Sequence, residues 1–206
     1  GLALNGGKKA VTMPVGDGDS WPQFGDEEIE AVNAVVRHFG YGEVEAFEKD
    51  WKEHFKTPFC KSHMNGTSAL HVALLITGVE ADDEVLVPDL TFIAPAFAVR
   101  YCGAWPVLTD VDPLTWQMDP ILVKRFLAED CQIKNGALIN RRSGRRVKAI
   151  LPVHLLGHPV DMDPIMEAAR EYGLTVIEDA TESLGASYKG RQVGTLGDLA
   201  CLSFNG

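Results

Sequence analysis

The sequence predicts an α/β fold of three layers, in which helices cover both faces of a mostly parallel central sheet. From residue 59 onward, short apolar runs alternate with amphipathic stretches, a rhythm that requires parallel strands joined by crossover helices. The runs at 147–154 and 174–178 are apolar nearly throughout, as strands buried on both faces are. The expected strands are 59–63, 84–88, 105–111, 147–154, 174–178 and 199–204, and the expected helices between them are 67–78, 92–102, 120–129 and 164–172.

The N-terminal part of the chain differs in composition. Residues 1–20, rich in Gly, Asp and Lys, are expected to form an arm, and residues 21–206 a single large domain. Helices are expected at 26–38, where three acidic residues open the first turn, and at 44–55, where aromatic residues recur every four positions.

Two short segments interrupt the strand-helix rhythm and are expected to be β-hairpins. One lies in the polar insertion 130–146, with Asn135-Gly136 as a turn signal, and the other at 188–194, with Lys189-Gly190. The last strand runs into Asn205-Gly206, which opens a loop that the sequence does not close. We therefore expect the chain to be the N-terminal portion of a longer protein.

Composition excludes several classes of function. The 206 residues include 19 basic and 29 acidic side chains, and the net charge of −10 argues against a broad surface for nucleic acid or anionic lipid. No apolar run is long enough to cross a bilayer, and the segment Gly1–Val11 lacks the apolar region of a secretory signal. We expect a cytoplasmic protein that binds neither nucleic acid nor membrane and holds any anionic ligand locally.

The cysteines point to the same compartment. They are widely spaced and form no CxxC pair, which is typical of reduced, packed thiols and not of a disulfide or zinc framework. The four are Cys60, Cys102, Cys131 and Cys201.

The segment Asn65-Gly66-Thr67-Ser68 opens an expected helix and suits a phosphate group. Gly66 allows close approach of the backbone, and the amides of Thr67 and Ser68 would point outward from the helix N-terminus beside two hydroxyl groups. The alternative is an ordinary capped helix start, because Thr and Ser are favoured there in any case.

Glu178-Asp179 ends an expected strand, at the edge where ligands of open parallel sheets bind. A carboxylate there could stabilise a protonated ring nitrogen, ligate a metal or cap the next segment, and the residues alone leave these alternatives open. The glycine-rich loops of dinucleotide-binding proteins and of nucleoside-triphosphatases are absent from the sequence. Nucleoside-triphosphate chemistry is therefore disfavoured.

Two further patterns favour structural roles. His154 and His158 have a spacing that suits a metal, but the residues between and after them predict a turn, and no cysteine or carboxylate cluster lies beside them in the sequence. We therefore expect no metal site. Four arginines between 141 and 146 surround a predicted turn and favour a solvated hairpin.

Six motifs, in this order, resemble the DegT/DnrJ/EryC1/StrS family of pyridoxal-phosphate-dependent nucleotide-sugar aminotransferases, which have the aspartate-aminotransferase fold, or fold type I. The resemblance extends from about Trp21 to the last residue. The motifs are Asn65–His71 (NGTSALH), Asp83–Pro88 (DEVLVP) followed by Thr91-Phe92, Pro152–His154 (PVH), Ile177–Ala180 (IEDA), Gly185–Gly190 (GASYKG) and Val193–Asp198 (VGTLGD).

The resemblance implies roles for individual residues in binding pyridoxal 5'-phosphate (PLP). Thr67 and Ser68, next to Gly66, would hold the cofactor phosphate together with Ser203. Phe92 would stack on the pyridine ring, and Asp179 would pair with the protonated ring nitrogen. Glu182 matches a family position near the pyridine oxygen; because an anion there would be repelled, we expect this carboxyl to be protonated or turned toward the substrate.

The resemblance places no catalytic residue within the chain. The family's Schiff-base lysine is expected two residues after Gly206, followed by the small C-terminal domain, and Lys189 belongs to a hairpin motif and cannot replace that lysine. The implied reaction transfers an amino group from an amino acid, with glutamate the expected donor, to a keto carbon of a nucleotide-linked deoxysugar, with pyridoxamine 5'-phosphate (PMP) as intermediate. The polar insertion resembles that of relatives acting at C4. The resemblance also implies a homodimer with shared active sites.

Three alternatives remain open from the sequence. An aminocyclitol aminotransferase of the same family has parallels in the N-terminal stretch. A PMP-dependent sugar dehydratase would carry histidine in place of the lysine, and a non-catalytic relative would lack the lysine altogether. Fold alone does not distinguish among them.

Overall fold

The structure, a computed structural model, describes residues 24–38 and 42–204. The chain divides into two compact units, residues 1–47 with residue 206, and residues 48–205. Helix α1 (Asp26–His38) has the predicted bounds, and its three acidic residues in the first turn suit the positive end of the helix dipole. Helix α2 (Gly42–Phe55) begins in the first unit and continues in the second. The arm expected at 1–20 lies outside the described residues, and its separation from a domain of 21–206 stays a prediction.

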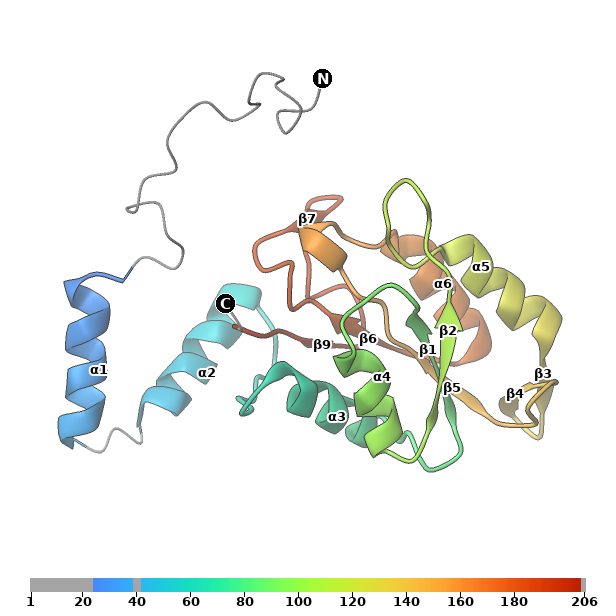
Figure 1. Ribbon diagram of the computed structural model, residues 1–206, viewed down its shortest axis with the longest axis horizontal. Coiled ribbons are helices and arrows are strands. Elements are labelled where there is room, and N and C mark those ends of the chain that lie inside the picture. The colour runs from blue at the N-terminus through green and yellow to red at the C-terminus, as the bar shows by residue number, and fades with distance from the viewer. Residues whose placement is uncertain (1–23, 39–41, 205–206) are drawn as a thin grey trace, which may run out of the picture. The chain divides into compact units, whose positions relative to one another are not determined.

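The second unit contains a five-stranded sheet with the order β2-β1-β5-β6-β9 (Figure 1). Every neighbouring pair of strands in it is parallel. The predicted α/β fold with a mostly parallel central sheet is therefore confirmed. The strands are β1 (Glu84–Pro88), β2 (Trp105–Thr109), β5 (Val147–Ile150), β6 (Thr175–Asp179) and β9 (Leu199–Cys201).

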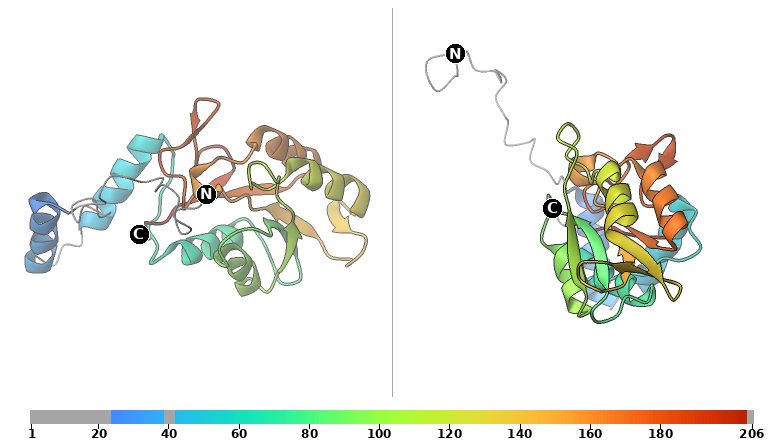
Figure 2. Two further views of the ribbon diagram at one scale, coloured as in Figure 1. Left: turned by 45° about the horizontal axis from the view of Figure 1, so that its top comes forward. Right: turned by 90° about the vertical axis from the view of Figure 1, so that its right-hand side faces the viewer.

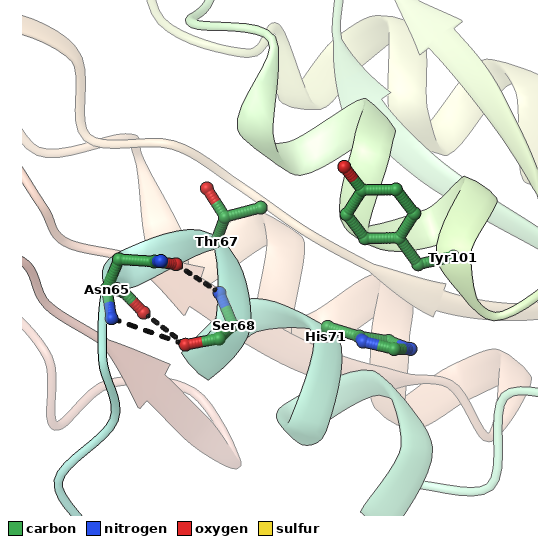
Figure 3. A pocket seen from close by; sticks show the side chains of 5 residues that line it. All are labelled: Asn65, Thr67, Ser68, His71 and Tyr101. Atoms are coloured by element: carbon green, nitrogen blue, oxygen red, sulfur yellow. Dashed lines mark hydrogen bonds between the residues drawn. The ribbon is translucent and has the colours of Figure 1, made fainter.

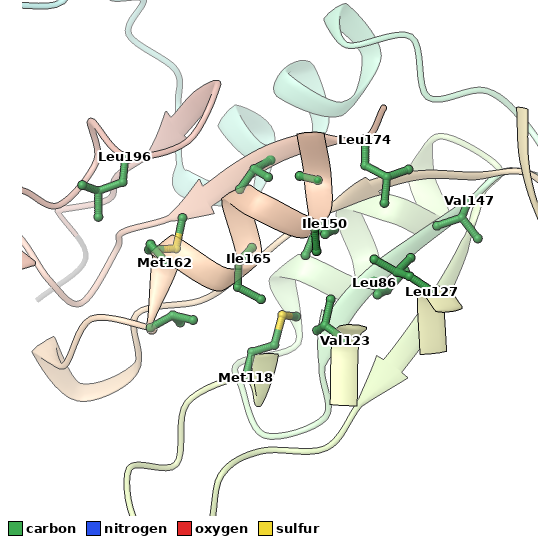
Figure 4. Packing of buried hydrophobic residues seen from close by; sticks show 14 of the residues in the cluster. Leu86, Met118, Val123, Leu127, Val147, Ile150, Met162, Ile165, Leu174 and Leu196 are labelled. Atoms are coloured by element: carbon green, nitrogen blue, oxygen red, sulfur yellow. The ribbon is translucent and has the colours of Figure 1, made fainter. Parts of the chain in front are cut away.

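Helices cover both faces of this sheet (Figures 1 and 2). Strand β1 shows why its sequence is apolar throughout. Val85 and Val87 pack in the cluster with α3 and α4. Leu86 packs in the cluster with α5 and α6, which Figure 4 shows. A strand buried on both faces needs no polar alternation. The covering helices are α3 (Gly66–Ile76) and α4 (Ala94–Tyr101) on one face, and α5 (Pro120–Arg125) and α6 (Met162–Tyr172) on the other.

Both predicted hairpins are confirmed. Asn135 and Gly136 have φ values of 52° and 79°, and Lys189 and Gly190 have values of 50° and 77°. Positive φ at both central residues is what a two-residue type I′ turn requires. The paired strands are β3 (Cys131–Lys134) with β4 (Ala137–Asn140), and β7 (Ser187–Tyr188) with β8 (Arg191–Gln192); a π-helical turn, Phe126–Asp130, joins α5 to β3.

The strand expected at 59–63 is a wrong prediction. Phe59 is 86% exposed, and the Ser62 N–H donates to Glu48 Oε1 at 2.8 Å. The Lys61 ammonium group donates to Glu48 Oε2 at 2.5 Å. A side chain of α2 thus takes a backbone hydrogen bond that a strand would give to its neighbour, so the segment joins no sheet.

The solvated basic hairpin is wrong in one respect. Arg146 donates from Nε and Nη2 to the two carboxylate oxygens of Asp83, at 2.7 and 2.6 Å, and Asp83 is 5% exposed. This two-point geometry binds the segment before β5 to the turn before β1.

In the described part of the chain, no helix is long and apolar enough to cross a membrane.

The strand order determines where a ligand can bind. From β1 the chain passes through α4 to β2, whereas from β5 it passes through α6 to β6, in the opposite direction and over the opposite face. The adjacent carboxyl ends of β1 and β5 therefore form a topological switch point, where the following loops diverge and ligands of open α/β sheets bind. The loops 89–93 and 151–161 begin there, and β6 ends beside them.

Candidate functional site

The N-terminus of α3 is closed by a reciprocal cap. The Ser68 N–H donates to Asn65 Oδ1 at 2.8 Å, and Ser68 Oγ donates to the Asn65 carbonyl at 2.7 Å while receiving the Asn65 N–H at 3.3 Å. The Ser68 amide and hydroxyl are thus engaged within the cap. The Gly66 and Thr67 amides, which open the helix, have no acceptor inside it. They are the donors that an anion could use.

Gly66 lies against residues from two other strand ends. A Cβ atom at Gly66 would come within 2.9 Å of Ser203 Cβ and 3.3 Å of Ser203 Oγ, and within 3.6 Å of Thr181 Oγ1. The backbone of α3 can approach the ends of β6 and β9 this closely only because residue 66 has no side chain. Two hydroxyl groups therefore lie beside the open amides of the helix.

Asp179 ends β6 and is 5% exposed. Its Oδ1 accepts the Thr181 hydroxyl at 2.7 Å and the Thr181 N–H at 3.2 Å, whereas Oδ2 accepts no hydrogen bond from the residues that the structure describes. Burial raises the pKa of Asp179, and the two Thr181 bonds act in the opposite direction. One carboxylate oxygen is thus fixed, and the other remains available to a ligand.

Glu178, the neighbour of Asp179, lies on the other face of the strand and is fully buried. Its Oε1 accepts the Leu196 and Gly197 amides, each at 2.7 Å, and its Oε2 accepts the Gly194 amide and His154 Nε2, each at 3.0 Å. Four donors satisfy the carboxylate, so Glu178 holds the loop before β9 and offers nothing to a ligand.

His154 has a structural role in the same network. Its Nδ1 accepts the Val160 N–H at 3.0 Å, which places the proton on Nε2, the atom facing Glu178. Both ring nitrogens are thus engaged. Within the ranges 24–38 and 42–204, no group of three or more His, Cys, Asp or Glu side chains could hold a metal ion.

Phe92 and Glu182 follow strands at the same edge of the sheet as the cluster around Gly66. Phe92 follows β1 and is 70% exposed. Glu182 is exposed, and its Oε2 accepts the Leu156 N–H at 2.6 Å. The structure therefore brings together Gly66, Thr67, Ser68, Asp179 and Ser203, and gives Glu182 a backbone partner.

A pocket of about 370 Å³ opens between the start of α3 and the end of α4 (Figure 3). Its far side is formed by His71 and Tyr101, whose rings meet edge to face with centroids 5.7 Å apart. Sequence reasoning missed these two residues, and it also missed Thr181. The position of Thr181, two residues after an aspartate at a strand end, is a local signal for a side chain-to-backbone turn.

Proteins of known sequence and structure resemble this chain. It is 47% identical over 160 residues to GDP-perosamine synthase from Caulobacter vibrioides, covering 78% of this chain and 39% of the relative. It is 38% identical over 176 residues to UDP-2-acetamido-2-deoxy-3-oxo-D-glucuronate aminotransferase from Pseudomonas aeruginosa, covering 84% and 45%. The chain thus spans less than half the length of these curated relatives.

Solved structures agree with the observed fold. An aminotransferase from Psychrobacter cryohalolentis superposes with a TM-score of 0.77 at 35% identity, covering 90% of this chain and 44% of that one. NtdA from Bacillus subtilis with bound cofactor PMP superposes with a TM-score of 0.72 at 30% identity, covering 88% and 39%. Residues 22–206 match the DegT/DnrJ/EryC1/StrS aminotransferase family, and the chain belongs to that family.

Proposed function

We propose that the protein containing this chain is a PLP-dependent aminotransferase that acts on a nucleotide-linked keto sugar. The observation that carries the proposal is the meeting of three elements at one sheet edge: the open amides of α3, the Ser203 hydroxyl against Gly66, and the buried Asp179 carboxylate linked to them by Thr181. An anion site and a buried carboxylate side by side are what a phosphorylated pyridine requires at its two ends.

The residues present fit the cofactor. The Gly66 and Thr67 amides, with the hydroxyl groups of Thr67 and Ser203, would hold its phosphate, and Ser68 supports them through the cap. Phe92, exposed at the switch point, would cover one face of the ring. When bound, the cofactor supplies an electron sink for the carbanion formed at the substrate carbon.

Asp179 would keep a proton on the ring nitrogen. Its free Oδ2 is the oxygen that would accept that N–H, while Thr181 fixes Oδ1 and so sets the plane of the carboxylate. The two Thr181 bonds favour the ionised carboxylate against the effect of burial, and only the ionised form can pair with a protonated nitrogen. The lysine expected beyond Gly206 as Schiff-base residue and general base stays a prediction.

The finer substrate assignment is also a proposal. We favour glutamate as donor and C4 of a nucleotide-linked deoxysugar as acceptor, and the similarity to a GDP-perosamine synthase supports a nucleotide-linked sugar. The resemblance of the polar insertion to that of C4-acting relatives supports C4, although Asn140 in its hairpin binds Glu84 at the start of β1, at the edge opposite the candidate site. A relative acting on a 3-oxo sugar makes C3 the competing position.

The test uses the full-length protein with PLP and nitrogen-labelled glutamate, offered nucleotide-linked 4-keto and 3-keto sugars separately. We expect labelled amino sugar from the 4-keto substrate, and loss of turnover in Asp179→Asn. Asp82→Asn is the matched control, because Asp82 lies before β1 and the salt bridge that it makes is on the exposed surface. Absence of amino transfer to any keto sugar by a protein that binds PLP would contradict the proposal.

We further propose that the protein acts as a homodimer. Support comes from large apolar side chains that are exposed on the outer surfaces of α3 and α4, an arrangement that monomeric proteins seldom show. These side chains are Leu75, Ile76, Phe97 and Tyr101. Sedimentation of the full-length protein tests the proposed dimer, and a monomer at all concentrations would contradict it. The cytoplasmic location expected from the sequence stays a prediction.

A further inference from the structure

The loop Leu155–His158, which follows β5 after the segment 151–154, is held by side chains outside it. Gln117, which is 4% exposed, binds both backbone groups of Leu155: its Oε1 accepts the Leu155 N–H at 3.0 Å, and its Nε2 donates to the Leu155 carbonyl at 3.1 Å. On the exit side, the Val160 N–H donates to His154 Nδ1. The entry and the exit of the loop are therefore both fixed.

Between these two attachments, Leu156 adopts a left-handed conformation, with φ 55° and ψ 29°. This region is disfavoured for a leucine, because its Cβ crowds the backbone. The Leu156 N–H donates to Glu182 Oε2 at 2.6 Å, and a Cβ at Gly157 would lie 3.4 Å from the Glu182 carbonyl. The Glu182 carboxylate thus holds the strained turn through a hydrogen bond. Strain of this kind persists only where the surroundings impose it, and it clusters at binding sites.

The position of the turn connects it to the candidate site. The loop lies in the segment 151–161, which leaves the carboxyl end of β5 at the switch point, and Glu182 lies three residues after Asp179, the last residue of β6. The Leu156 side chain is 72% exposed. The large apolar side chain of Leu156 is therefore exposed at the edge of the sheet where the ligand is expected. The backbone of Leu156 would not adopt its left-handed conformation without support.

We infer that Glu182 is a positioning residue for the sugar substrate: its carboxylate holds Leu156 in the left-handed conformation, so that the leucine side chain forms an apolar wall against a deoxygenated part of the sugar. The inference rests on the proposed function and concerns the same site. Glu182 Oε2 accepts the Leu156 N–H, and the expectation that this carboxyl lies near the pyridine oxygen stays a prediction.

The test separates this role from contact with the cofactor by means of four variants of the full-length protein. Glu182→Ala removes the acceptor, whereas Glu182→Gln keeps an oxygen that can accept the same N–H. Leu156→Gly allows the turn to form unaided, because glycine adopts positive φ freely. The fourth variant combines Glu182→Ala with Leu156→Gly, and Glu171→Ala, another exposed carboxylate, is the control.

We expect Glu182→Ala to raise KM for the keto sugar roughly tenfold, the ratio expected when a left-handed non-glycine residue loses its support, with PLP affinity unchanged. Glu182→Gln should remain near wild type. In the Leu156→Gly background, adding Glu182→Ala should change KM little. The inference is overturned if Glu182→Ala weakens PLP binding, if Glu182→Gln is as harmful as Glu182→Ala, or if the full effect persists in the Leu156→Gly background.

A second measurement does not depend on catalysis. A protease that cleaves after leucine, applied to the cofactor-free protein, should cut at Leu155 or Leu156 faster in Glu182→Ala than in wild type, and at the wild-type rate in Glu171→Ala. Equal rates in Glu182→Ala and wild type would overturn the inference. If wild type shows no amino transfer, the proposed function fails, while the protease comparison still decides whether Glu182 holds the loop.

Discussion

Glu178→Gln tests the buried network most directly, because the change removes one charge and alters no volume. The carboxylate accepts two hydrogen bonds at each oxygen, from the Leu196 and Gly197 amides at Oε1 and from the Gly194 amide and His154 at Oε2. A glutamine can point its carbonyl at one pair of donors. Its amide NH2 then faces the other pair, donor against donor.

The magnitude follows from the donors left unpaired. If the amide NH2 faces Gly194 and His154, the imidazole could turn Nε2 into an acceptor only by moving its proton to Nδ1, where it would lose the Val160 N–H. Either way, two buried donors lose their acceptor, at about 1–3 kcal/mol each. We therefore expect a loss of about 2–6 kcal/mol in the free energy of unfolding.

Urea denaturation at neutral pH measures this loss. With a slope of about 2 kcal/mol per molar urea, the midpoint should fall by about 2 M. The control is Glu80→Gln, which removes the charge of a carboxylate whose side chain is 77% exposed and pairs with Arg146. An exposed pair of this kind contributes about 0–1 kcal/mol, so the control midpoint should move little.

The pH dependence has a defined sign. Burial raises the pKa of Glu178, but hydrogen bonds from His154, Gly197 and Gly194 outweigh burial and hold the pKa below the ordinary value of 4.5. A depressed pKa contributes stability that is complete above 4.5 and is lost as the pH falls through the folded-state pKa. The difference between wild type and Glu178→Gln should therefore shrink in acid. A midpoint no lower than that of Glu80→Gln, or a difference that is unchanged in acid, would refute the reasoning.

Three further predictions concern the candidate site and the thiols. Gly66→Ala places a methyl group 2.9 Å from a neighbouring Cβ and should weaken PLP binding about tenfold in an absorbance titration, with the fold retained by circular dichroism. Thr181→Val removes the hydroxyl that favours ionised Asp179, so the pKa of Asp179 should rise further and the pH midpoint of PLP binding should move upward. Burial raises the pKa of Cys201 to about 12 and that of Cys131 to about 11, so near neutral pH a thiol reagent should label these two only after unfolding, and later than the two half-buried cysteines.

The fold could be predicted where the local sequence alone determines an element. Strand β1 has its predicted bounds because every residue in it is buried, so no polar position obscures the apolar run. Helix α6 ends as predicted because Gly173 takes the left-handed conformation, with φ 68°, that closes a helix. The pattern of residues 59–63 predicts a strand wrongly, because it does not reveal that Glu48 accepts the Ser62 N–H.

The candidate site could be predicted only in part, for a related reason. The cap at Asn65 is local and visible in the sequence, but the closeness of Gly66 to Ser203 depends on strand order. Glu178 and Asp179 are adjacent carboxylates at one strand end, and a shift of one residue in the strand would exchange their faces. In the observed register, Glu178 meets four donors beneath the sheet, and Asp179 keeps one oxygen free at its edge. The four hydrogen bonds to Glu178 leave it unavailable to a ligand. The same bonds fix the end of β6, and so they hold Asp179 where it can bind a ligand.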